Sequence, residues 1–177
     1  LVARRSSKMP PPSAVEPSLS PQLARLDELE QLETAILTIL AAGAEKLAGR
    51  MFVLSLDTIR QRYGTSWRYV SEKAHRSADR YLRSELGQTD ILAPVGSVDF
   101  ILILFQCTKR EAPARALRLD QGMVMAVTGD DLGLAGVTAK EVAPADGGTV
   151  KFRNLTHEDL KRAQTPAGPP IIDLESE

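Results

Sequence analysis

The sequence predicts an α+β fold in which a mainly antiparallel sheet is covered by helices and preceded by a long N-terminal helix. Three observations lead to this prediction. Residues 51–56 form an apolar run, interrupted only by Ser55, that suits a central strand. Residues 91–95 and 100–105 are two further strand-like runs joined at Gly96-Ser97, which indicates a hairpin with a two-residue turn. Between them, residues 66–86 carry apolar side chains at helical spacing and stop at Gly87.

The bulk composition is that of one globular domain. The chain has 177 residues, 43% hydrophobic and 25% charged, with a formal net charge of −1. This charge balance does not favour nucleic acid or anionic lipid as a partner. The single cysteine, Cys107, excludes an intrachain disulfide and suits a small core or strand-end position. No apolar run reaches the roughly 18 residues of a membrane span, so we expect a cytoplasmic location. The start at Leu1, not Met, suggests a fragment, which would then be a cytoplasmic domain of a larger protein.

Both ends of the chain have the composition of tails. Residues 1–20 are rich in proline and serine, and residues 165–177 combine prolines with acidic residues. Such segments bury too little apolar surface to offset the entropy of ordering. We expect a disordered N-terminal linker and a flexible acidic C-terminal tail.

Residues 21–48 predict an N-terminal helix, with Ser20 as N-cap and Pro21 at the first helical position. It is expected to run to about residue 47. Two interpretations remain open: the helix lies on its own domain, or it forms a dimer interface. Its apolar stripe contains Leu29, Leu32, Ile36 and Ile39.

Shorter elements fill the rest of the domain, which is expected to span residues 50–164. Asp57 is expected to cap a short helix over residues 58–63. After Phe105 the pattern weakens. Thr156 and Asp159 resemble a capping box that opens the last helix. The expected elements of this second half are a helix over 109–119, strands over 123–127, 136–142 and 149–152, a turn over 143–148, and a helix over 156–164.

The order of strand, two helices and hairpin resembles the GGDEF (diguanylate cyclase) domain of the nucleotide cyclases. In that family the first strand ends in Asp-x-Asp, and the hairpin carries Gly-Gly-(Asp/Glu)-Glu-Phe. Phe52-Val-Leu-Ser-Leu-Asp57 falls on the first strand, and Gly96-Ser-Val-Asp-Phe100 falls on the signature without a gap. Residues 155–163 also resemble a late helix of the family. The resemblance implies a GGDEF-like, ferredoxin-like antiparallel sheet.

The resemblance also implies which positions would carry cyclase chemistry, and most of them have lost it. Active members need two carboxylates to hold Mg²⁺ on the triphosphate, because hard cations prefer charged oxygen ligands. Ser55 and Val98 occupy those two positions here. The guanine-reading Asn corresponds to Tyr63 and its partner Asp to Glu72, while the second signature glycine is Ser97.

Part of the signature survives in Gly96, Asp99 and Phe100. The Arg of the inhibitory product-binding motif corresponds to Gly87, which leaves Asp90 without that guanidinium partner. Asp57 and Asp99 could form a metal pair only if the first strand slid by two residues. We therefore expect no metal site.

Two further features have alternative interpretations. His75 lies among charged residues of a helix and is expected to be solvated. Trp67 could stack a base or bind a partner together with nearby arginines, or simply pack under the first strand. These arginines are Arg60, Arg62 and Arg68.

Together these observations predict a catalytically inactive GGDEF-like signalling domain of a bacterial cyclic di-GMP pathway, with no catalytic residue and no cofactor. Its expected partner is another protein or a second copy. Two alternatives remain open: a domain that senses guanine nucleotide or cyclic di-GMP in a rebuilt pocket, and a ferredoxin-like module of unrelated function. The rebuilt pocket would use Ser55, Asp57, Tyr63, Glu72, Gly96, Ser97 and Asp99.

Overall fold

The computed structural model describes residues 21–130 and 138–164, and the two predicted tails lie outside them. Six α-helices, one short 3-10 helix and five strands follow one another in these residues. The helices are α1 (Pro21–Ala41), α2 (Ala44–Leu47), α3 (Asp57–Tyr63), α4 (Trp67–Glu85), α5 (Ala112–Thr128) and α6 (His157–Gln164), and η1 (Gly64–Ser66) links α3 to α4. The strands are β1 (Met51–Ser55), β2 (Ile91–Val95), β3 (Asp99–Ile103), β4 (Lys140–Ala145) and β5 (Thr149–Asn154).

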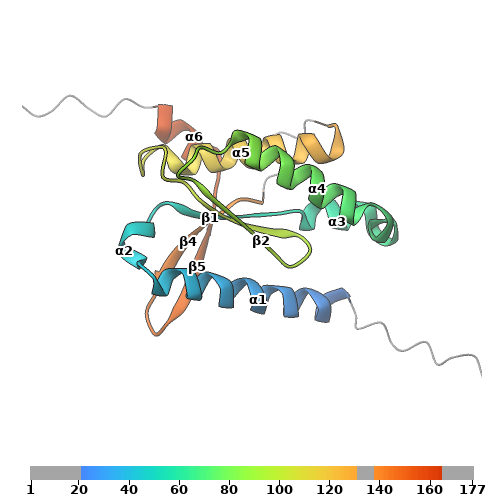
Figure 1. Ribbon diagram of the computed structural model, residues 1–177, viewed down its shortest axis with the longest axis horizontal. Coiled ribbons are helices and arrows are strands. Elements are labelled where there is room, and N and C mark those ends of the chain that lie inside the picture. Colours follow the sequence, from blue (N-terminus) through green and yellow to red (C-terminus); the bar gives the residue numbers. More distant parts are fainter. Residues whose placement is uncertain (1–20, 131–137, 165–177) are drawn as a thin grey trace, which may run out of the picture.

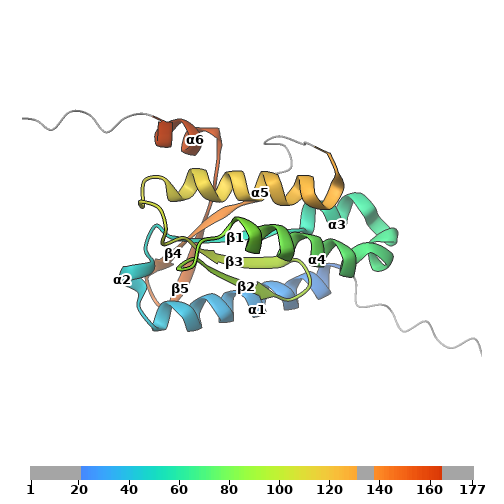
Figure 2. The same ribbon diagram turned by 45° about the horizontal axis from the view of Figure 1, so that its top comes forward.

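The five strands form one sheet with the order β2-β3-β1-β4-β5, and every neighbouring pair is antiparallel. The first four strands and the helices between them follow the β-α-β-β-α-β succession of ferredoxin-like folds, and β5 extends one edge. Helices α4 and α5 lie on one side of the sheet and α1 lies on the other (Figures 1 and 2). The predicted α+β class and helix-covered antiparallel sheet are confirmed.

The central strands β1 and β3 are apolar except at Ser55 and Asp99, because both faces of the sheet are buried. Successive side chains of a strand point to opposite faces. Phe52 and Leu54 therefore meet α4 and α5, whereas Met51 and Val53 meet α1. The same alternation along β3 places Phe100 and Leu102 on the first face, and Ile101 and Ile103 on the second.

The N-terminal helix is shorter than predicted. It ends at Ala41, and a turn at residues 42–43 separates it from α2. Leu32 and Ile36 are fully buried against the sheet, whereas Ile39 is half-buried and Leu29 is 41% exposed. The helix thus lies on its own domain, as one of the two interpretations expected. Dimerisation stays a prediction, but Leu32 and Ile36 are already used within the chain.

The strand predicted over residues 123–127 is wrong, because α5 continues through it to Thr128. Met123 and Val124 are buried on the inner face of this helix. Gly122 lies where α5 packs on α4: a Cβ there would lie 1.7 Å from the hydroxyl oxygen of Tyr81 on α4. The glycine therefore permits close approach of the two helices.

The last three elements follow the prediction more closely. Strand β4 continues to Ala145, so the predicted turn over 143–148 is limited to residues 146–148, where Gly147 and Gly148 have positive φ. Residues 136 and 137 of the predicted strand lie outside the described residues. The Asp159 carboxylate accepts the backbone N–H of Thr156 at 2.8 Å, which confirms one half of the capping box before α6.

Candidate functional site

The hairpin lies directly beside the end of β1. Val95 pairs with Asp99, so the connection has three residues (Gly96, Ser97 and Val98) and not the predicted two. Gly96 has φ +60, a conformation that glycine adopts without strain. Ser55 is the register partner of Asp99, and both side chains therefore project toward the α1 side of the sheet.

An ion-pair cluster joins this point to α1. The Arg25 guanidinium makes two hydrogen bonds to the Asp99 carboxylate, at 2.8 and 3.3 Å, although the residues are 74 positions apart. Arg25 also lies 3.8 Å from Asp57 and 3.4 Å from Glu28. Arg60 of α3 completes the cluster with bonds to Glu28 at 3.1 Å and to Asp57 at 2.5 Å.

Burial and pairing act in opposite directions on the charges of this cluster. Asp99 is 1% exposed, and Arg25 provides the cation that pairs with its buried carboxylate. Burial lowers the pKa of Arg25, but its bonds to Asp99 outweigh burial and the pKa is raised. Burial raises the pKa of Glu28, but the Ser97 hydroxyl that donates to it and the two guanidinium groups outweigh burial and the pKa is lowered. Pairing therefore favours the charged forms.

The Ser55 side chain makes a hydrogen bond to the backbone at the start of α3. Its hydroxyl accepts the N–H of Asp57 at 3.1 Å. The capping prediction for Asp57 is therefore wrong: Asp57 is the first residue of α3, Leu56 precedes it, and the Asp57 carboxylate binds Arg60 and Gln61. The Thr138 hydroxyl closes the arrangement, since it donates to the Ser55 carbonyl at 2.9 Å and accepts the Ser55 N–H at 3.2 Å.

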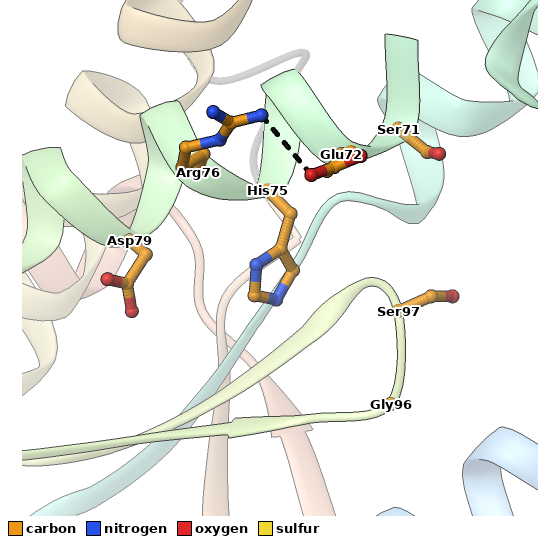
Figure 3. Close-up of a pocket in the computed structure, with 7 residues that line it drawn as sticks. All are labelled: Ser71, Glu72, His75, Arg76, Asp79, Gly96 and Ser97. Carbon is orange, nitrogen blue, oxygen red and sulfur yellow. Dashed lines mark hydrogen bonds and ion pairs between the residues drawn. The ribbon is translucent and has the colours of Figure 1, made fainter. Parts of the chain in front are cut away.

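A hollow of about 560 Å³ lies between α4 and the hairpin turn (Figure 3). Glu72, Gly96 and Ser97 line it, and the exposed Glu72 carboxylate pairs with Arg76 at 3.4 Å. The His75 ring points from α4 toward the hairpin and stacks on Phe100 at a centroid distance of 4.9 Å. Its buried Nε2 has no hydrogen-bond partner in the described part of the chain. The expectation of a solvated His75 is therefore wrong.

Tyr63 is not brought to this hollow. Its ring is 39% exposed, lies 6.3 Å from the Trp67 ring, and lines a separate small cavity with Arg62 and Asp130. Trp67 is partly buried against the core of the α4 and α5 face. The structure therefore brings Glu72, Gly96 and Ser97 together, brings Ser55, Asp57 and Asp99 together, and leaves Tyr63 apart.

Asp90 has a guanidinium partner, although Gly87 replaces the arginine of the family motif. Arg115 of α5 approaches its carboxylate at 2.8 Å, and three backbone N–H groups also donate to it. Burial raises the pKa of Asp90, but these bonds outweigh burial and the pKa is lowered. Asp90 therefore fixes the start of the hairpin strand to the loop after β3.

The residues that sequence reasoning missed are Arg25, Glu28, Thr138 and the structural role of His75. Charged residues in the first turns of a helix are ordinary, so no sequence signal linked Arg25 to Asp99. Over residues 21–130 and 138–164, no group of three or more His, Cys, Asp or Glu side chains is arranged to hold a metal ion. None of the helices in these ranges is both long and apolar enough to cross a membrane.

Comparisons of the chain with protein-family models, curated proteins and solved structures found no match.

Proposed function

We propose that this chain is a GGDEF-like regulatory domain without cyclase activity that acts by binding a protein partner or a second copy of itself. The observation that supports the proposal most directly is the Arg25–Asp99 pair. It places a guanidinium against the surviving acid of the GGDEF-like signature.

The chemistry of the site favours the loss of activity. Two-carboxylate metal sites need negative charge that is free to bind a cation. Ser55 and Val98 supply none, and Val98 is fully buried. The two remaining acids, Asp57 and Asp99, each lie against a guanidinium. A divalent cation would have to displace Arg25 or Arg60 to reach them.

Exposed apolar side chains on the first half of α1 support the interaction part of the proposal. Leu23, Leu26 and Leu29 are between 41% and 60% exposed. Beside them, a hollow of about 680 Å³ is lined by Leu26, Trp67 and several arginines. Trp and Arg are enriched among the residues that dominate binding energy at protein interfaces. As part of the same proposal, the domain works in the cytoplasm.

Two measurements test the proposal. Incubation of the full chain with GTP and Mg²⁺ should yield no cyclic di-GMP by liquid chromatography; product that Asp99→Ala abolishes would contradict the absence of cyclase activity.

Light scattering should show self-association, or a tagged chain should retain a partner, and Leu26→Glu should abolish that association. The matched control is Glu30→Gln, an exposed change on the same helix. A monomer without any partner would contradict the interaction part.

The unpartnered Nε2 of His75 favours one alternative, a domain that senses guanine nucleotide in the hollow beside Glu72. A buried polar atom without a partner is costly, and a bound base could satisfy it. Calorimetric titration with GTP and with cyclic di-GMP tests this function. Binding that His75→Phe weakens would support sensing, and the absence of heat at about 1 mM ligand would exclude any affinity that a sensor could use.

A further inference from the structure

Another cavity, distinct from the hollow of Figure 3, lies between α1 and the β1-β4-β5 side of the sheet. Its volume is about 470 Å³, within the range of small-molecule sites. Its lining combines apolar and polar side chains. On the apolar side, Leu29 and Leu32 come from α1, Val53 forms the floor, and Phe152 comes from the edge strand β5.

The sheet register places two polar side chains beside this floor. Val53 pairs with Lys140, and Lys140 pairs with Asn154. Register partners project to the same face of an antiparallel sheet. Because Val53 packs on the α1 side, Lys140 and Asn154 project to that side as well, and both line the cavity.

The charges around the cavity differ in whether they are already paired. At one end Arg25 is held by Asp99, and Asp57 is held by Arg60. At the other end, Lys140 has no carboxylate within ion-pair distance among residues 21–130 and 138–164. The cavity therefore offers one free cation, which projects to the same side as its apolar floor.

We propose that this cavity binds a small amphipathic carboxylic acid. Its apolar body lies between the α1 leucines and Phe152, and its carboxylate receives hydrogen bonds from the Lys140 ammonium and the Asn154 amide. An ammonium–carboxylate bond of this kind is charge-assisted and stronger than a neutral one. An amine ligand is disfavoured, because the carboxylates that line the cavity already hold guanidinium groups. This inference does not depend on the proposed regulatory function.

Three probes with the same apolar chain separate recognition of the head group from simple burial of the tail. Octanoate, octanol and octylamine are titrated into the full chain, and binding is followed by calorimetry and by NMR shifts of the Leu29 and Val53 methyl groups. Octanoate is expected to bind at least about fivefold more tightly than octanol, the equivalent of one added charge-assisted hydrogen bond. Octylamine is expected to bind more weakly than either.

Lys140→Gln should remove the preference for octanoate over octanol, and Lys140→Arg should retain it. Lys151→Gln is the matched control: Lys151 lies one residue from Phe152 on β5, so it projects to the opposite face, and octanoate affinity should not change. Phe152→Ala should weaken octanoate and octanol equally. Equal affinities for octanoate and octanol in the unmodified chain, or an effect of Lys151→Gln equal to that of Lys140→Gln, would overturn the proposal.

Discussion

The two faces of the sheet are buried in different ways. The face under α4 and α5 is closed by an almost wholly apolar cluster that includes Phe52, Phe100 and Leu117. The face under α1 is closed by buried apolar side chains of the second half of that helix, at Leu32 and Ile36. Beneath its first half, Arg25 and Glu28 join the ion-pair cluster, and the 470 Å³ cavity opens beside it. One face therefore supplies most of the stability, and the other carries the groups that are able to recognise a ligand.

The largest expected effect comes from the apolar face. Phe52→Ala should lower the free energy of unfolding by about 3–5 kcal/mol, because it removes a fully buried ring and leaves a cavity. Urea unfolding monitored by circular dichroism measures this loss. Leu29→Ala on the other face is the control, with an expected change below about 1 kcal/mol because that side chain is 41% exposed. Equal losses would show that the faces do not differ in this way.

Asp120 is a buried acidic residue on the otherwise apolar α4 and α5 side. Its contribution to stability should depend on pH. Its Oδ2 accepts the N–H groups of Thr138 and Ala139, while Oδ1 has no partner in the described residues. Burial raises the pKa of Asp120 from 3.8 to about 7, although the two N–H bonds oppose the shift. The folded chain therefore retains a proton that the unfolded chain loses.

The free energy of unfolding should consequently fall as pH rises from about 4 to about 7, by at most about 4 kcal/mol, and level off above that range. Urea unfolding at several pH values measures the slope. Asp120→Asn, which keeps the shape and one accepting oxygen, should remove this part of the slope. The same slope in the variant would assign it to another group.

The stability contributed by the ion-pair cluster should depend on whether both partners of a pair are present. Arg25→Leu leaves Asp99 buried without its cation and should cost about 2–3 kcal/mol. Adding Asp99→Leu should recover most of that loss, because replacing both charges by apolar groups removes the unpaired charge. Arg76→Leu, which breaks an exposed pair with Glu72, should change stability by less than about 0.5 kcal/mol. A double variant as unstable as Arg25→Leu would contradict this account.

The smallest effect is expected at Glu28. Because its pKa is lowered in the folded chain, its contribution is present above its ordinary pKa of 4.5 and is lost as pH falls below that value. Glu28→Gln should therefore lower the free energy of unfolding by about 0.5–1 kcal/mol at pH 7 and by nearly nothing at pH 3. The contribution of Glu28 thus disappears with acid, whereas that of Asp120 becomes less favourable with base. The difference in stability between the variant and the unmodified chain at the two pH values provides the measurement.

Local patterns were sufficient to predict much of the fold. The apolar run at residues 51–55, the helix that contains Ala74, Ala78 and Leu82, and the hairpin at Gly96 all matched the structure because each depends on neighbours a few positions away. The prediction of a strand failed over residues 123–127, which belong to α5. Within this helix Gly122 lies against Tyr81 of α4, and no local pattern encodes such a contact.

The candidate site depended still more on tertiary structure. From the sequence alone it followed that Ser55 and Val98 bring no carboxylate to the hairpin and that Asp99 follows its turn. Only the folded chain placed Arg25 on Asp99, Arg115 on Asp90 and Lys140 beside an apolar cavity. The physical reason is that side-chain chemistry is fixed by residue type. The charge that each group faces, and the water it loses, depend on which distant helix or strand covers it.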